Sequence, residues 1–183
     1  MNGNNSGGIR NCLIIGNSAG SFAGGGAWLE NKNMVENCTI VSNYAGGSSY
    51  GGGIFVKTQA GGTNYLANCI VYHNIGGGNY SNYCDVYGDA FASYSNCCIA
   101  PAISVKSQGY SINNIAVDPQ CVSKDTGNFR LSRNSLCINA GVNRAWMTGA
   151  VDRDGHRRVD KFSGIVDIGC YEYLPSGVIF TMK

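Results

Sequence analysis

A short motif that recurs along the first half of the chain constrains the fold more than any other feature. Four segments carry an Asn-Cys pair within a run of β-branched and other apolar residues, and they begin at Ile9, Val35, Leu66 and Tyr94. The Asn-Cys pairs start at positions 11, 37, 68 and 96, which gives steps of 26, 31 and 28 residues. Self-similarity with such a period is typical of solenoids and other repeat architectures.

Each repeat reads as strands and not as helices, because its apolar residues are short, β-branched and alternating. The Cys and the apolar residue two positions later share one face of a strand. The apolar residue three positions before the Cys would point to the other face of a straight strand, so the chain must bend between them. The Asn before each Cys is the candidate for this bend, because Asn tolerates the left-handed backbone conformation.

Such repeats bury their apolar face only by stacking on one another in parallel ladders. Leucine-rich repeats would be richer in Leu, and propeller blades would be longer. The sequence therefore predicts an all-β fold, a right-handed parallel β-helix (a solenoid), with coils over residues 1–100. Residues 101–183, where the repeat fades, are predicted to form the terminal coil or coils and an irregular C-terminal cap of the same domain, which covers an exposed end. The repeated Asn17, Asn43 and Asn74 are expected to hydrogen-bond from coil to coil.

Composition limits the partners of the chain. The formal net charge is only +2, and only Arg153, Arg157 and Arg158 form a basic cluster. Nucleic-acid-binding proteins carry a basic patch, so no nucleic-acid partner is expected. No apolar run approaches the about 20 residues of a membrane-spanning helix, so no membrane insertion is expected.

Nine cysteines fall into two groups. Cys12, Cys38, Cys69 and Cys97 follow the repeat and are expected to be stacked, buried thiols, since free Cys behaves as a small hydrophobe. The others lie outside this register, and disulfides in an oxidising compartment are one interpretation of them; they are Cys84, Cys98, Cys121, Cys137 and Cys170.

The last third of the chain carries an ordered set of motifs. They are Asp118-Pro-Gln-Cys-Val122, Phe129-Arg-Leu131 with Ser135, Cys137-Ile138 and Ala140-Gly141, Asp152-Arg-Asp-Gly155 with Arg158, and Val166-Asp-Ile-Gly169 with Tyr171-Glu-Tyr173. This order resembles the C-terminal end of bacterial secreted β-helix proteins, described as pectin-lyase-like or choice-of-anchor-Q domain proteins. Cys121 and Leu136 depart from that pattern, where an aromatic residue and a Pro are more usual, and together with Cys137 and Cys170 they suggest a disulfide in the cap.

The resemblance implies a secreted or cell-surface location. Residues 1–8 contain no signal-peptide pattern, so we expect the sequence to start inside a longer protein whose export signal lies outside this chain; an incomplete gene and a deliberate truncation are the alternatives. The family that it resembles includes polysaccharide lyases and hydrolases, but also adhesins, and a fold does not fix a function.

Candidate catalytic residues are few. Asp152, Asp154, Asp167 and Glu172 form the densest acidic group, and Asp85 with Asp89 forms a second pair. An EF-hand loop starting at Asp152 would need Glu at its twelfth position, which is Ser163, so that type of calcium site is not expected. No cofactor is expected, although a structural calcium of another kind, or a turn held by carboxylate–Arg pairs, both remain open.

Aromatic residues are the stronger functional signal. Trp28 and Phe55 occupy equivalent positions in two aligned segments, Gly24–Glu30 and Gly51–Lys57, and Tyr72 lies on a strand of the next repeat. Aromatic rings stack on sugars, so these three are predicted binding residues. His73 is a further candidate acid or base at neutral pH.

Two functions follow from this sequence. The first is an extracellular β-helix module associated with carbohydrate binding or cell-surface structure. The second is a polysaccharide-degrading enzyme, either a glycoside hydrolase or a polysaccharide lyase. Polysaccharide is the expected partner, and self-association through the open N-terminal coil is a further expectation, because an unpaired strand edge invites another chain.

Overall fold

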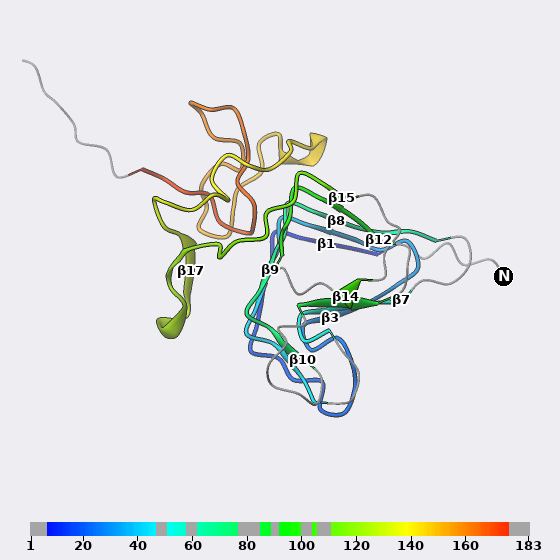
Figure 1. Cartoon of the computed structure of the whole chain (residues 1–183). Coiled ribbons are helices and arrows are strands. Elements are labelled where there is room, and N and C mark those ends of the chain that lie inside the picture. Colours follow the sequence, from blue (N-terminus) through cyan, green and yellow to red (C-terminus); the bar gives the residue numbers. More distant parts are fainter. Residues whose placement is uncertain are drawn as a thin grey trace, which may run out of the picture.

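The computed structural model describes residues 7–46, 51–57, 62–76, 85–88, 92–99, 104–105 and 111–175. This part of the chain is all-β, with two short 3-10 helices, η1 (Lys124–Thr126) and η2 (Ala145–Met147), and no α-helix. Three parallel sheets dominate it (Figure 1).

The strands of each parallel sheet come from successive repeats. Sheet 1 contains β1 (Gly8–Arg10), β4 (Met34–Glu36), β8 (Asn64–Ala67), β12 (Ala92–Ser95) and β15 (Ser111–Ile112). Sheet 2 contains β2 (Leu13–Ile15), β5 (Thr39–Val41), β9 (Ile70–Tyr72) and β13 (Cys98–Ile99). Sheet 3 contains β3 (Ala27–Glu30), β7 (Ile54–Lys57), β11 (Val86–Gly88) and β14 (Ser104–Val105). A parallel pair joins β6 (Tyr44–Ala45) to β10 (Ile75–Gly76), and an antiparallel hairpin joins β16 (Cys121–Ser123) to β17 (Asn128–Leu131).

The strand register confirms the alignment of the repeats. In sheet 1, Val35 pairs with Ile9 on one side and with Leu66 on the other. In sheet 2, Ile40 pairs with Ile14 and with Val71. The pairing therefore follows the 26- and 31-residue steps of the sequence, and equivalent side chains lie next to one another.

The predicted bend at the Asn of each Asn-Cys pair is confirmed. Asn11, Asn37, Asn68 and Asn96 have φ values of 56°, 47°, 53° and 51°, which lie in the left-handed region. The bend turns the chain from sheet 1 into sheet 2, so the apolar residues before and after it both reach one core. That core includes residues three before, at and two after each Cys, as in the set Val35, Cys38, Ile40, Leu66, Cys69 and Val71.

Two ladders of identical side chains run along this core. The thiols of Cys38, Cys69 and Cys97 are buried and that of Cys12 is half-buried; Cys38 and Cys69 each donate to a carbonyl of the preceding repeat, that of Ile9 at 3.8 Å and that of Val35 at 3.4 Å. The side-chain oxygen of Asn43 accepts from the backbone and side-chain N–H groups of Asn17, at 3.0 and 2.9 Å. The oxygen of Asn74 accepts from the same groups of Asn43 at the same distances. Both ladders agree with the expectation from the sequence.

The region from residue 118 to 175, here the C-terminal region, does not lie where the sequence suggested. Instead of covering an end of the repeats, it lies beside them, along the corner between sheets 1 and 2 (Figure 1). The four bend asparagines each donate a side-chain N–H to a carbonyl of this region, at 2.8 to 3.3 Å; the acceptors are Val151, Asp167, Val142 and Ala140. The left-handed bend points each amide outward, and this row of donors holds the C-terminal region along all four repeats.

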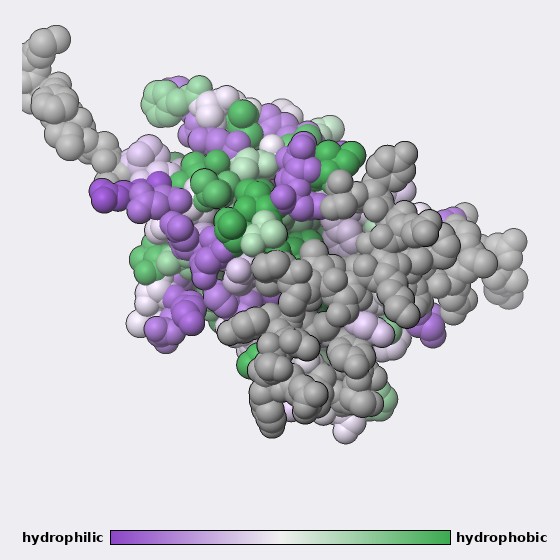
Figure 2. Space-filling view, viewed as in Figure 1, coloured by the Kyte–Doolittle hydropathy of each residue, from purple (hydrophilic) through white to green (hydrophobic). Residues whose placement is uncertain are grey.

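A second apolar core lies between the outer face of sheet 2 and the C-terminal region. The outer face of sheet 2 presents Val41, Ile70 and Cys98, which pack against residues of the C-terminal region. The partners from that region include Phe129, Leu131, Cys137, Ile168, Cys170 and Tyr171. Figure 2 shows hydrophobic side chains gathered over this junction. Sheet 2 is therefore buried on both faces, which is the usual state of parallel strands.

The eight described cysteines are free thiols. The disulfide expected within the C-terminal region is therefore not present in this structure, and Cys84 lies outside the described residues. In the described part of the chain, β1, β2 and β3 each pair on one side only, so the first repeat has open strand edges. No helix in the described ranges has the length and apolar character of a membrane span.

Candidate functional site

An aromatic stack lies on the outer face of sheet 3. Trp28, Phe55 and Tyr87 are register partners on β3, β7 and β11. The ring centroids are 4.4 Å apart for Trp28 and Phe55 and 5.9 Å apart for Phe55 and Tyr87, with interplanar angles of 32° and 31°. The structure thus brings together two of the three predicted binding residues and adds Tyr87.

Both pairs are tilted by about 30°, between an offset stack and an edge-to-face contact, and their centroids lie within the range of favourable aromatic pairs. Phe55 is covered on both sides, whereas Trp28 lies on β3, an edge strand of sheet 3 in the described residues, and is 47% exposed. An ion pair between Glu30 and Lys57, with 3.5 Å between Oε1 and Nζ, lies on the same face two residues further along. The stack therefore offers an exposed ring with charged hydrogen-bonding groups beside it.

Tyr72 lies elsewhere. It is half-buried on the outer face of sheet 2, packs against the second core and meets the ring of His73 edge-on, with the centroids 4.7 Å apart. Tyr72 and the aromatic stack are thus on different sheets, and Tyr72 contacts the candidate acid or base His73.

A pocket of about 330 Å³ opens beside His73, between the end of β9 and the hairpin β16–β17. Its lining combines one imidazole, two carboxylates, an amine, a hydroxyl and a thiol; the residues are His73, Asp118, Cys121, Val122, Ser123, Lys124 and Asp125. This volume lies at the lower end of the range of small-ligand pockets. The pocket can hold a ligand of the size of one sugar unit.

The imidazole of His73 is oriented by a carboxylate. Its Nε2 lies 3.5 Å from Oδ2 of Asp118, whose Oδ1 accepts from the backbone N–H of Gln120 at 2.7 Å. Burial lowers the pKa of His73 below its ordinary value of 6.5; the nearby carboxylate of Asp118 opposes this shift, and Lys124 adds to it. A neutral imidazole of this kind can accept a proton near neutral pH. Burial also raises the pKa of Cys121 to about 12, so that thiol is not activated as a nucleophile.

Comparisons with protein-family models, with curated proteins and with solved structures found no match to this chain.

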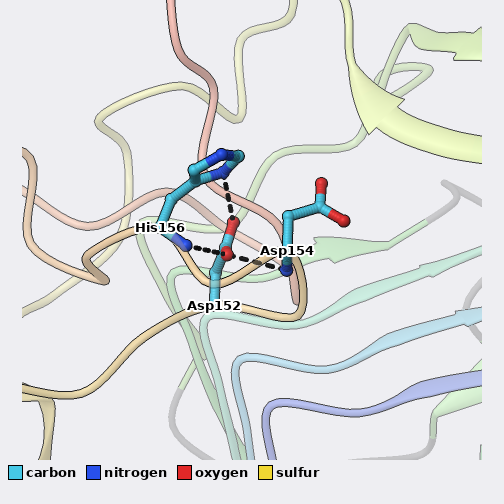
Figure 3. A group of neighbouring side chains, drawn as sticks. All are labelled: Asp152, Asp154 and His156. Atoms are coloured by element: carbon cyan, nitrogen blue, oxygen red, sulfur yellow. Dashed lines mark hydrogen bonds and ion pairs between the residues drawn. The ribbon is translucent and has the colours of Figure 1, made fainter.

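Two members of the predicted acidic group, Asp152 and Asp154, lie with His156 in the one set of at least three metal-ligand side chains found in the described residues (Figure 3). Both carboxylate oxygens of Asp152 already accept hydrogen bonds from backbone N–H groups. Oδ1 accepts from the backbone N–H groups of Asp154 and His156, each at 2.8 Å, and Oδ2 accepts from that of Glu172 at 2.8 Å. Both oxygens of Asp154 pair with Arg130 at 2.6 Å.

Calcium would need six to eight oxygen ligands, and this set supplies two carboxylates that are both engaged by protein donors. The residues therefore do not fit the structural calcium that the sequence left open. The arrangement is that of a turn held by its own Asp, with an Asp–Arg pair on its outside.

Asp167 and Glu172 lie in a buried network around Arg158, and all three side chains are nearly inaccessible to solvent. Arg158 Nη2 lies 3.1 Å from Oε1 of Glu172, and Arg158 also donates to the carbonyl of Gly169 at 2.9 Å. The oxygens of Asp167 accept from the backbone N–H groups of Asn139 and Tyr173 at 2.7 and 2.6 Å. These buried carboxylates accept hydrogen bonds from the protein and hold loops together.

Asp85 is also buried, at 1% exposure, and it ends the Asn ladder. Its Oδ1 accepts from the backbone and side-chain N–H groups of Asn74 at 2.8 and 2.7 Å, in the place that the next Asn would take. Its Oδ2 has no hydrogen-bond partner, and burial raises the pKa of this carboxyl to about 6. Asp89, its predicted partner, lies outside the described residues.

Sequence reasoning missed Asp118 as the partner of His73, because 45 positions separate them and no local pattern links them. Tyr87 could have been found, since it follows Asp85 at the same offset at which Phe55 follows Gly53 in the aligned segment.

Proposed function

We propose that this chain is a carbohydrate-binding module of a secreted or cell-surface protein, built as a right-handed parallel β-helix. Three observations support the helix: equivalent strands of successive repeats pair in parallel, each repeat visits the sheets in the same order, and the apolar residues of the repeats share one core. The right hand follows from the general preference of parallel crossover connections. The secreted location and the likeness to bacterial pectin-lyase-like proteins are parts of the same proposal.

The observation that carries the binding function is the aromatic stack on sheet 3. A large ring that is nearly half exposed, supported from behind by Phe55 and Tyr87, forms a rigid apolar platform at low entropic cost. The Glu30–Lys57 pair beside it offers an acceptor and a donor to sugar hydroxyl groups. We infer that one sugar ring of a polysaccharide packs on Trp28.

The test is affinity electrophoresis of the purified chain through gels that contain plant, algal or bacterial polysaccharides. Retardation by one polysaccharide is expected, and Trp28→Ala should weaken the affinity about 5- to 150-fold, since stacking contacts of this kind contribute about 1–3 kcal/mol. Tyr65→Ala is the matched control, because Tyr65 on sheet 1 is 49% exposed against 47% for Trp28. Equal weakening by both variants, or no retardation by any polysaccharide, would contradict the proposal.

A second candidate is a polysaccharide-degrading enzyme, which is favoured by the pocket with the His73–Asp118 pair. The oriented imidazole suits proton abstraction in an elimination, and Asp118 with Asp125 supplies the two carboxylates that glycoside hydrolysis requires. Incubation with the same polysaccharides, with and without calcium, should then release new chain ends.

Unsaturated ends would identify a lyase and reducing ends alone a hydrolase. His73→Gln should abolish the release, while His156→Gln, outside the pocket, should leave it unchanged. A complete lack of turnover across the panel would rule out the enzyme for this chain.

Self-association through the first repeat is a further proposal. In the described residues β1, β2 and β3 have free edges, and the apolar side chains of Ile9 and Ile14 at this end of the core are only partly buried. Pairing of such edges between two copies would double the mass in solution. If the molecular mass in solution remains that of a monomer from 1 μM to 1 mM (roughly the range of weak association), the proposal of self-association is contradicted.

A further inference from the structure

Four cysteines meet in the second core, between sheet 2 and the C-terminal region. Cys98 belongs to β13 of sheet 2, whereas Cys121, Cys137 and Cys170 come from the C-terminal region. Cys98, Cys137 and Cys170 are fully buried, and Cys121 is half-buried. None of these thiols takes part in the candidate sugar site on sheet 3.

Two of the four come from segments that are tied together. Cys98 and Cys137 belong to the same buried cluster, and Asn96, two residues before Cys98, donates its side-chain N–H to the carbonyl of Ala140, three residues after Cys137, at 2.9 Å. Interaction between the two thiols raises the pKa of Cys98 and lowers that of Cys137. Cys98 also lies 3.2 Å from the carbonyl oxygen of Val117. Cys121 is only partly buried and packs against the edge of this cluster.

The backbone at both cysteines is fixed. Cys98 forms a parallel bridge with Ile115 and donates its backbone N–H to the carbonyl of Cys69 at 2.8 Å, and the carbonyl of Cys137 accepts from the N–H of Ile168 at 2.9 Å. Two cysteines of one buried cluster that lie on two fixed, adjoining segments are positioned to be joined with little backbone movement.

We propose that Cys98 and Cys137 form a disulfide when the protein is in an oxidising compartment, and that this bond fastens the C-terminal region to sheet 2. The oxidant is a low-molecular-weight disulfide such as oxidised glutathione. The Cys137 thiolate attacks one of its sulfurs and releases one glutathione; the Cys98 thiolate then attacks the Cys137 side of the mixed disulfide and releases the second. One S–S bond forms and one breaks, two electrons pass to the oxidant, and the two protons end on the two glutathione thiols.

The bond would close a loop of 39 residues, the separation of positions 98 and 137. Closing a loop of this length restricts the unfolded chain, and for a protein of this size the expected gain is a rise in Tm of about 10 °C. Because both thiols are buried, oxidation of the folded protein requires the C-terminal region to open and should be slower than oxidation during refolding.

The test begins with the full chain, reduced and refolded in the presence of oxidised glutathione, alkylated and digested with trypsin without reduction. Trypsin yields peptide 134–144, which contains Cys137 as its only cysteine, and peptide 58–106, which contains Cys98 and three other cysteines. The expected product is these two peptides joined with the loss of two hydrogen atoms, and fragment spectra must place the bond at Cys98 and not at its neighbour Cys97. Thermal unfolding with and without dithiothreitol should show the rise in Tm and its loss on reduction.

Two variants complete the test. Cys137→Ala should remove both the linked peptide and the effect of dithiothreitol on Tm, whereas Cys121→Ala should keep both. Alkylation of all nine cysteines in the refolded wild-type chain, or a bond from Cys137 to Cys121 or Cys170, would overturn the proposal even if Cys137→Ala fails to fold.

Discussion

At the scale of single residues, the most informative side chain is the carboxyl of Asp85. The two strands before it in sheet 3 begin after Gly26 and Gly53, where a Cβ atom would meet a ladder Asn nitrogen at 2.9 and 2.7 Å. Asp85 stands at the equivalent place and supplies the acceptor for Asn74 itself. The cost is a buried carboxylate with one unpaired oxygen, whose pKa rises from 3.8 to about 6 through burial.

Asp85→Asn is expected to stabilise the protein at neutral pH. A carboxyl with a raised pKa in the folded state contributes its stability fully below about pH 4 and loses it as the pH rises through about 6. The variant keeps an oxygen for Asn74 without the charge, so the gain at pH 7 is up to about 3 kcal/mol and disappears near pH 3.5. Urea unfolding at a series of pH values measures it.

Asp125→Asn is the control for this prediction, because Asp125 has a side chain that is 88% exposed and its charge is screened by solvent. If the free energy of unfolding of Asp85→Asn equals that of the wild type at every pH, burial of the charged carboxylate does not destabilise the protein.

Arg158 is the second decisive residue. Its side chain is fully buried, and the carboxylate of Glu172 is its counter-charge. Burial raises the pKa of Glu172, an effect that Arg158 opposes and the neighbouring Asp167 increases. Without the guanidinium, a set of acidic groups would remain buried with no cation among them.

Arg158→Met should therefore lower the free energy of unfolding by about 3–5 kcal/mol, the usual effect of breaking a buried ion pair. Arg157→Met tests the same change one residue earlier on an exposed side chain and should stay within about 0.5 kcal/mol. Chemical denaturation compares the two. Similar losses in the free energy of unfolding for both variants would mean that the buried network around Arg158 does not stabilise the fold.

At the scale of elements, the ladders decide how strands of neighbouring repeats are held in register. The Asn ladder follows the ends of β2, β5 and β9, and its middle member, Asn43, makes bonds in both directions along the stack. Its side-chain nitrogen also donates to the carbonyls of Ile14 and Val41, at 3.0 and 3.1 Å. The end member, Asn17, is exposed, so its substitution should remove less stabilisation than the substitution of Asn43.

Asn43→Ala should lower the free energy of unfolding by about 2–4 kcal/mol, because several buried polar groups lose their partners at once. Asn17→Ala, which removes one end of the same ladder, should cost at most about 1 kcal/mol. Urea unfolding monitored by circular dichroism gives both values. A larger effect at Asn17 than at Asn43 would contradict the ladder as the source of register.

These elements were largely accessible from the sequence. The repeat fixed the pairing of Val35 with Ile9 and Leu66, and the odd spacing between Val35 and Cys38 required the bend that Asn37 provides. Such features depend on local conformational preference and on a period, which a sequence displays directly. The hairpin β16–β17 has no counterpart in the repeat, and its position beside His73 was not predictable.

At the scale of the whole molecule, the C-terminal region and the sheets share a core and a row of hydrogen bonds. Four bend asparagines donate to this region, and Arg10 of β1 lies over the ring of Trp146 in η2, 5.4 Å from its centroid. Contacts spread over all repeats should couple the unfolding of the two parts.

The two tryptophans make this coupling measurable, since Trp28 reports on sheet 3 and Trp146 on the C-terminal region. Single-tryptophan variants, Trp28→Phe and Trp146→Phe, should give fluorescence transitions that coincide with each other and with circular dichroism in each variant's own urea titration, under reducing conditions. A transition of the Trp146 signal that precedes the circular dichroism change would show that the C-terminal region unfolds first, as an independent unit.

The sequence by itself determined the strands, their register, the left-handed asparagines and the ladders, because each depends on residues that recur at a fixed step. It also marked Trp28 and Phe55 as equivalent positions. Only the tertiary structure decided where the C-terminal region lies, that Asp152, Asp167 and Glu172 are buried as structural groups, and that His73 meets Asp118 in a pocket. Those contacts join segments that are far apart in the chain and follow no period. They depend on which apolar surfaces pack against each other in the folded protein and not on any local pattern.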